Sequence, residues 1–254
     1  RGYAMVLMLI GSIIISFGGL IVRNIETADN WQINFYRSIA FGTAISIALL
    51  LRYGKTGLQQ FKGIGLQGVW AAMLLACASI SFLQAITNTT VAATTFTLSS
   101  IPFLTAIMAW LFLGERIGKS TVSTMLIATV GISLMFVQGL GSGTLYGNFM
   151  AFLCAIGFSS YAIIIRRNRR TEMLPTLILS NLIIVFVALI FRWDNLLISW
   201  SDLLLCFVLG GVLSATVNTL FIIASKHLFA AELTLFMLLE FTLGPIWVWI
   251  FVNE

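Results

Sequence analysis

Nine apolar segments, each about 20 residues long, dominate this 254-residue chain and restrict the folds open to it. They cover residues 3–22, 30–51, 64–86, 91–113, 119–138, 145–165, 174–191, 203–224 and 230–252. A run of about 20 apolar residues crosses the hydrocarbon core of a bilayer as one helix. The chain is 59% hydrophobic and 9% charged, whereas a soluble domain carries about 25% charged residues. We therefore predict an all-α membrane protein whose main solvent is the lipid bilayer.

The distribution of lysine and arginine predicts the direction of each segment. With the N-terminus in the cytoplasm, the inner links hold 11 of the 14 basic residues, the outer links hold Arg23 and Arg192, and Arg37 falls inside a span. An excess of basic residues in cytoplasmic loops is the normal bias of membrane proteins, and it accounts for the net charge of +5. The one basic cluster, four arginines within 166–170, directly follows an apolar run, so no nucleic-acid partner is expected.

Residues 85–115 and 224–254 are two copies of one segment. They align without a gap at an offset of 139 residues, and 8 of 31 positions are identical. The copies are the fourth and ninth spans, which run in opposite directions, so five helices make one repeat and the repeats are inverted. We predict a first repeat over 1–138 and a second over 139–254. The second lacks its last helix, so ten transmembrane helices are expected, with nine present, and the native gene should continue past Glu254.

Polar side chains gather on four of the spans. They are Trp70, Gln84 and Asn88 on the third, Thr94 and Thr97 on the fourth, Ser214 and Asn218 on the eighth, and Glu240 on the ninth. Polar groups in lipid are costly unless they face a partner or a cavity, so we expect these spans to enclose a substrate pocket. The alternative is that Ser, Thr and Gly only allow the helices to pack closely.

Two ionisable residues lie well inside spans, Arg37 in the second and Glu240 in the ninth. Arg37 could hold a carboxylate or phosphate, or extend to the membrane surface as an anchor. Glu240 could carry a proton, pair with a substrate ammonium, brace Arg37, or serve as a structural polar contact, because a buried carboxylate becomes neutral unless it is paired. Pro102 and Pro245 are expected to interrupt the fourth and ninth helices.

The residues that enzymes, metals and cofactors require are scarce in this chain. Cys77, Cys154 and Cys206 each sit in an apolar segment, and His227 is the only histidine. The sequence has no H-E-x-x-H helix and no G-x-x-x-x-G-K loop. We therefore expect no enzymatic activity, no metal site and no cofactor.

Several motifs resemble those of the EamA family within the drug/metabolite transporter superfamily. They are Tyr36–Arg37 in the second span, Ala92–Ala93 and Ser99–Ser100–Ile101–Pro102 in the fourth, and Leu113–Gly114–Glu115 at its end. The family often has Glu-Pro in the second repeat, whereas here Phe241 follows Glu240 and the proline comes at Pro245.

This resemblance implies a ten-helix transporter with both termini in the cytoplasm, in the bacterial inner (plasma) membrane, as a monomer or homodimer. It would move a small-molecule substrate by alternating access. In the family this substrate is often an amino acid, and transport is often outward. An alternative is a multidrug or organic-cation/proton antiporter, in which a membrane carboxylate exchanges protons for the cation.

Overall fold

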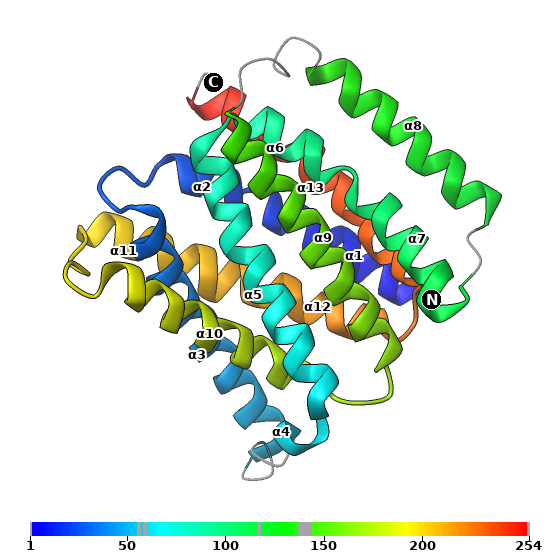
Figure 1. Ribbon diagram of the computed structural model, residues 1–254, viewed down its shortest axis with the longest axis horizontal. Helices are drawn as coiled ribbons and strands as arrows, with labels where there is room; N and C mark the ends of the chain where they lie inside the picture. The colour runs from blue at the N-terminus through cyan, green and yellow to red at the C-terminus, as the bar shows by residue number, and fades with distance from the viewer. Residues whose placement is uncertain (1, 55–56, 58–59, 116–117, 137–143, 253–254) are drawn as a thin grey trace.

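The computed structural model describes residues 2–54, 57, 60–115, 118–136 and 144–252, and every regular element in these ranges is helical (Figure 1). The elements are α1 (Gly2–Ser16), α2 (Gly18–Arg23), α3 (Asn30–Tyr53), α4 (Gln60–Gly63), α5 (Gly65–Asn88), α6 (Val91–Leu98), α7 (Ile101–Leu113), α8 (Lys119–Phe136), α9 (Leu145–Arg167), α10 (Leu174–Arg192), α11 (Trp200–Phe207), the π-helix η2 (Val208–Ser214), α12 (Ala215–Ser225) and α13 (Ala230–Val252).

Eight helical stretches are long and apolar enough to cross a membrane, so the chain is an integral membrane protein. They match eight of the nine predicted spans to within a few residues at each boundary. The remaining predicted span, 119–138, corresponds to α8, and its last two residues lie outside the described part of the chain. Helix α8 lies at the edge of the bundle, where it contacts α6 and α13 (Figure 1).

One of the two predicted proline interruptions is found. The fourth span divides at Ser99 and Ser100 into α6 and α7, and Pro102 occupies the first turn of α7, where its missing N–H removes no helical hydrogen bond. The interruption expected at Pro245 was wrong, because α13 continues through this position to Val252. A proline inside a helix removes a single backbone bond, which a long and packed helix can lose without ending.

The π-helix η2 was not predicted. It lies in the eighth span between α11 and α12, around the pair Gly210 and Gly211. The Ser214 hydroxyl donates to the Leu209 carbonyl, five residues earlier, at 2.8 Å. A π-turn adds a residue to the helical repeat and so changes which side chains face inward beyond it.

The bundle has two polar ends. We call the one with more lysine and arginine residues the basic end. The basic end carries Arg52, the four arginines within 166–170, and Lys226, and the chain also begins there (Figure 1). The opposite end carries Arg23 and Arg192 and the starts of α3 and α9. Helix α9 packs along α5, and α10 packs along α3. Small residues let α9 and α5 pack closely, because a Cβ at Gly157 of α9 would lie only 3.2 Å from the Leu74 carbonyl oxygen of α5.

Candidate functional site

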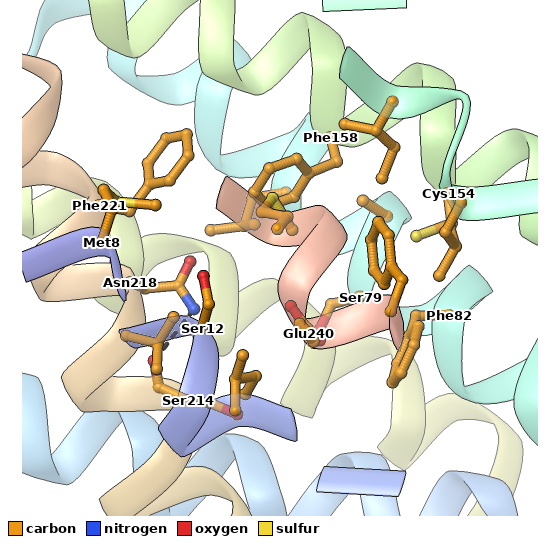
Figure 2. Close-up of a pocket in the computed structure, with 18 of the residues that line it drawn as sticks. Met8, Ser12, Ser79, Phe82, Cys154, Phe158, Ser214, Asn218, Phe221 and Glu240 are labelled. Carbon is orange, nitrogen blue, oxygen red and sulfur yellow. Dashed lines mark hydrogen bonds between the residues drawn. The ribbon is translucent and has the colours of Figure 1, made fainter. Parts of the chain in front are cut away.

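A cavity of about 140 Å³ lies near the middle of the bundle (Figure 2). Glu240, which lines it, is the eleventh of the 23 residues of α13, so the cavity lies about halfway along this helix. Side chains from α1, α3, α5, α6, α7, α9, η2, α12 and α13 line it, and most of them are apolar. The polar lining residues are Ser12, Arg37, Ser79, Ser214, Asn218 and Glu240. Apolar walls with a few convergent polar groups are the usual composition of a small-molecule site.

Arg37 reaches this cavity because of how α3 begins. The Asp29 side chain accepts hydrogen bonds from the backbone N–H groups of Trp31 and Gln32, and Gln32 returns a bond to Asp29, which together form a capping box. Arg37 therefore lies two turns inside the helix, where its side chain is buried. The guanidinium Nη2 donates to Asn34 Oδ1 at 3.1 Å and to Ser79 Oγ at 2.7 Å. Its Nε has no partner among the described residues.

The backbone beside Arg37 is in close contact with the π-helix. A Cβ at Gly210 would lie 2.0 Å from the Arg37 carbonyl oxygen, a distance that no side chain can tolerate. Only glycine fits at this crossing, so Gly210 sets the distance between α3 and η2 and with it the position of Arg37.

Glu240 is the acidic group of the cavity. Its side chain projects from α13 among the lining residues (Figure 2). Within the described part of the chain, its carboxylate has no hydrogen bond or ion pair to another residue, and Arg37 is the only basic residue that shares the cavity. The predicted possibility that Glu240 braces Arg37 is therefore not seen as a direct contact. Both charged groups remain available to a ligand.

Ser214 and Asn218, two of the residues singled out in the sequence, line the cavity one turn apart on η2 and α12. The Asn218 amide nitrogen donates to the Ser214 carbonyl at 3.0 Å, so the Asn218 Oδ1 atom is left as an acceptor. Ser12 on α1 donates to the Phe236 carbonyl of α13 at 2.8 Å and holds these two helices together beside the cavity.

Five predicted site residues lie elsewhere. Trp70 is on the membrane-facing side of α5, with 54% of its surface exposed. Gln84 and Asn88 lie near the end of α5 away from the basic end, where Gln84 Oε1 accepts from Asn30 and Asn88. Thr94 and Thr97 lie on α6 away from the cavity, and the Thr97 hydroxyl donates to the Ala93 backbone carbonyl. The expected polar stripe on the fourth span is therefore not a pocket wall, because Leu98 and Ile101, on either side of the helix break, face the cavity instead.

Sequence reasoning also missed residues that do line the cavity, notably Ser12, Ser79, Phe82, Cys154 and Phe158. The 139-residue offset of the repeat contained a signal for Ser79, because it pairs with the predicted Asn218. Seven pairs of lining residues are separated by this offset: Ile15 and Cys154, Leu75 and Ser214, Ala78 and Val217, Ser79 and Asn218, Phe82 and Phe221, Leu98 and Met237, and Ile101 and Glu240. The polarity is unequal, because Ser214 and Glu240 have apolar counterparts.

Polar contacts join the two halves of the chain at the basic end. Arg166 is 5% exposed, and its Nε lies 2.8 Å from Glu115 Oε1, while Nη1 donates to the Ser225 carbonyl at 2.8 Å. The second Glu115 oxygen accepts from the Ala230 N–H at 3.1 Å. Near this network, Glu172 accepts from the Tyr53 hydroxyl at 2.7 Å.

Contacts also join the two halves of the chain at the opposite end of the bundle. Asp202, at the start of α11, accepts hydrogen bonds from Thr27 and Ala28. Asp29 pairs with Arg192, and the Tyr36 hydroxyl donates to the Leu196 carbonyl at 2.7 Å. Contacts between residues far apart in sequence thus hold both ends of the bundle together.

The fold defines a helical membrane protein with several spans and a cavity between them. Residues 2–137 match the model of the EamA-like transporter family, which is more than half of the chain. The chain therefore belongs to the EamA-like transporter family, within the drug/metabolite transporter superfamily, and the resemblance seen in the sequence is confirmed.

Comparison with solved structures agrees with this fold. Among the chains of solved structures that match, one crystal structure superimposes with a TM-score of 0.80 at 14% sequence identity, over 100% of this chain and 90% of the other. At this identity the similarity shows the fold alone. No curated protein sequence matches the chain significantly.

Proposed function

We propose that this protein is a secondary transporter that moves small metabolites, namely amino acids or related compounds, out of the cell by alternating access. The observation that carries the proposal is the cavity in the middle of the membrane, where Arg37 and Glu240 are the two charged lining groups. Charged side chains at this depth are costly and mark substrate or ion pathways.

The inverted repeat is part of this proposal, with halves at 1–138 and 139–254. The seven lining pairs at the offset of 139 residues support it, because a site on a pseudo-two-fold axis receives equivalent residues from both halves. Gly42 and Asn181 are separated by the same offset, and a Cβ at Gly42 would lie 3.6 Å from the Asn181 Cβ. Two residues related by a two-fold axis meet in this way when they lie on the axis.

The helix packing supports the same symmetry. Helix α5 of the first half packs on α9 of the second half, and their equivalents at the 139-residue offset, α12 of the second half and α1 of the first, also pack together. Membrane transporters of this kind move one repeat against the other around a fixed site. Contacts join the halves at both ends of the bundle, so we propose that each set breaks in turn as the cavity opens to one side and then to the other.

The lining chemistry suits a zwitterion with an apolar side chain. The Arg37 guanidinium, oriented by Asn34 and Ser79, would bind the substrate carboxylate as a charge-assisted donor. Glu240 would bind the ammonium group or release a proton as the substrate enters. The apolar walls, including Phe82 and Phe221, would contact the side chain.

The cavity volume bears on the alternative function. About 140 Å³ is small beside the roughly 300–1,000 Å³ of sites for drug-sized ligands. An organic-cation/proton antiporter would also place its cation in a cavity that contains Arg37, which repels it. Both observations favour a small metabolite over a multidrug substrate.

The orientation in the membrane is likewise a proposal. We assign the basic end to the cytoplasm because 11 of 14 basic residues lie in the links on that side. The N-terminus, which lies at the basic end, is then cytoplasmic (Figure 1).

Transport in proteoliposomes tests the function. Purified protein is assayed with a panel of amino acids and organic cations, with and without a pH gradient. Glu240→Gln keeps the size of the side chain but removes its titration, so we expect it to abolish the pH dependence of transport. Glu232→Gln is the matched control: Glu232 lies in the first turn of the same helix and accepts from the Phe229 N–H, which a glutamine oxygen can also do.

The outcomes separate the alternatives. Uptake of amino acids with a pH profile that only Glu240→Gln flattens supports the proposal. Transport of organic cations but not amino acids favours the antiporter. An unchanged rate and pH profile in Glu240→Gln would mean that Glu240 is a structural polar contact.

A further inference from the structure

A second cavity, of about 410 Å³, lies on the side of the bundle at the basic end. Helix α9 packs against both α5 and α7 (Figure 1). The cavity lies between α5 and α7, over α9, because residues of these three helices line it. We call it the α5–α7 groove. Its walls include Trp70 of α5 and Phe112 of α7, which are 54% and 65% exposed, and its floor includes the buried Ile163 of α9. All three lie in candidate membrane spans, so lipid surrounds this groove.

The groove has a polar end. Arg167 is the last residue of α9 and Gln67 is the third residue of α5, so both lie where the spans leave the hydrocarbon. The Gln67 Oε1 atom accepts from Asn168 at 2.6 Å, which directs its amide nitrogen elsewhere. Within the described ranges, neither that nitrogen nor the Arg167 guanidinium has a hydrogen-bond or ion-pair partner. Two donor groups, one of them cationic, therefore stand unpaired at the mouth of an apolar groove.

The dimensions and charge suit a lipid. From Arg167 to Ser160, which lines the deeper part, the α9 backbone rises about 10 Å. This length places a headgroup at Arg167 and the start of an acyl chain beside Trp70 and Phe112. Arginine binds phosphate oxygens with two parallel donors, and basic pockets between helices at the cytoplasmic face bind anionic lipid headgroups.

The equivalent place at the opposite end lacks this chemistry. The offset of 139 residues relates Arg167 to Ala28 and Gln67 to Cys206. Among the described residues, the positions equivalent to Arg167 and Gln67 thus carry no cationic side chain, which favours a ligand from one leaflet.

We propose that the α5–α7 groove binds one anionic phospholipid of the cytoplasmic leaflet, with its phosphate on Arg167 and Gln67 and an acyl chain along Trp70 and Phe112. The bound lipid contacts α5, α7 and α9 together. Because it binds the folded bundle, it stabilises that bundle by linkage. This inference depends on the assigned orientation and not on the transported substrate.

Native mass spectrometry of the delipidated full chain in detergent tests the site. The probes are phosphatidylglycerol, which is anionic, and phosphatidylcholine, which is zwitterionic, and thermal unfolding is followed in parallel. Wild type should retain one phosphatidylglycerol in preference to phosphatidylcholine and gain thermal stability from it. Arg167→Gln should lower phosphatidylglycerol retention by about fivefold, the factor that one basic residue near the membrane surface contributes.

Arg169→Gln is the matched control, because it makes the same charge change at an exposed arginine that does not line the groove. It should leave retention unchanged. Ser160→Leu fills the groove without altering charge and should also reduce retention; Trp70→Ala, which removes a wall, replaces it if the leucine variant does not fold. Equal retention of the two lipids would overturn the proposal. So would equal effects of Arg167→Gln and Arg169→Gln, or a dimer in which Trp70 is covered by a second copy.

Discussion

Replacing Gly210 by alanine tests the idea that the crossing of α3 and η2 sets the position of Arg37. The added Cβ would lie 2.0 Å from the Arg37 carbonyl oxygen. A non-bonded carbon needs about 3 Å or more, so the two helices must separate by about 1 Å at this point. Overpacking of this kind costs about 2 kcal/mol of unfolding free energy. In a protein of this size that corresponds to a fall of roughly 4–8 °C in Tm.

The effect on transport should exceed the effect on stability. Displacing a positioned charged group by about 1 Å can lower a rate by about 100-fold in enzymes. We therefore expect Gly210→Ala to reduce amino-acid transport strongly in protein that still inserts and folds. Tm measured in detergent and initial rates measured in proteoliposomes separate the two effects.

The next residue supplies the control. A Cβ at Gly211 would lie 3.4 Å from the Ala40 carbonyl oxygen, which is ordinary contact. Gly211→Ala makes the same chemical change in the same π-helix, and alanine is favoured over glycine in helices by up to about 1 kcal/mol. It should leave Tm and transport at or above the wild-type values. If Gly210→Ala and Gly211→Ala behave alike, the crossing does not control Arg37 and the reasoning fails.

Three further predictions concern the ends and the core of the bundle. Arg166→Ala should lower the unfolding free energy by about 3–5 kcal/mol, because it leaves the Glu115 carboxylate without its buried partner. Restoration of Tm in the double variant with Glu115→Ala would support this. A wild-type Tm in the single variant would contradict it. Tyr161→Phe should leave Tm unchanged or raise it by a few degrees, since the buried Tyr161 hydroxyl has no partner among the described residues; a fall of several degrees would show that the hydroxyl is bonded. In a cysteine-free background, a cysteine near Thr89 should react with an impermeant thiol reagent added outside, whereas one near Asn168 should not, and labelling near Asn168 would reverse the assigned orientation.

The spans were readable from the sequence because their cause is local. Each one needs only enough consecutive apolar residues to cross the hydrocarbon, and lipid forces such a run to satisfy its own backbone as a helix. Arg37 and Glu240 were identifiable for the same reason, since an ionisable group inside a span is rare and costly. The inverted repeat and the orientation also come from the sequence, through the 139-residue offset and the basic links, and both remain predictions.

Tertiary structure alone decided which side chains face the cavity. In a soluble helix, polarity separates the inner face from the outer face, but in a membrane both faces are apolar and the sequence pattern loses that information. Trp70 was therefore placed in the pocket although it faces lipid, while Phe158 in the pocket gave no signal. The helix break before Pro102 and the π-turns of η2 further changed which residues point inward, because each rotates the helix that follows it. Apolar length, which is a local property, thus determined the spans, whereas packing between distant segments determined the site.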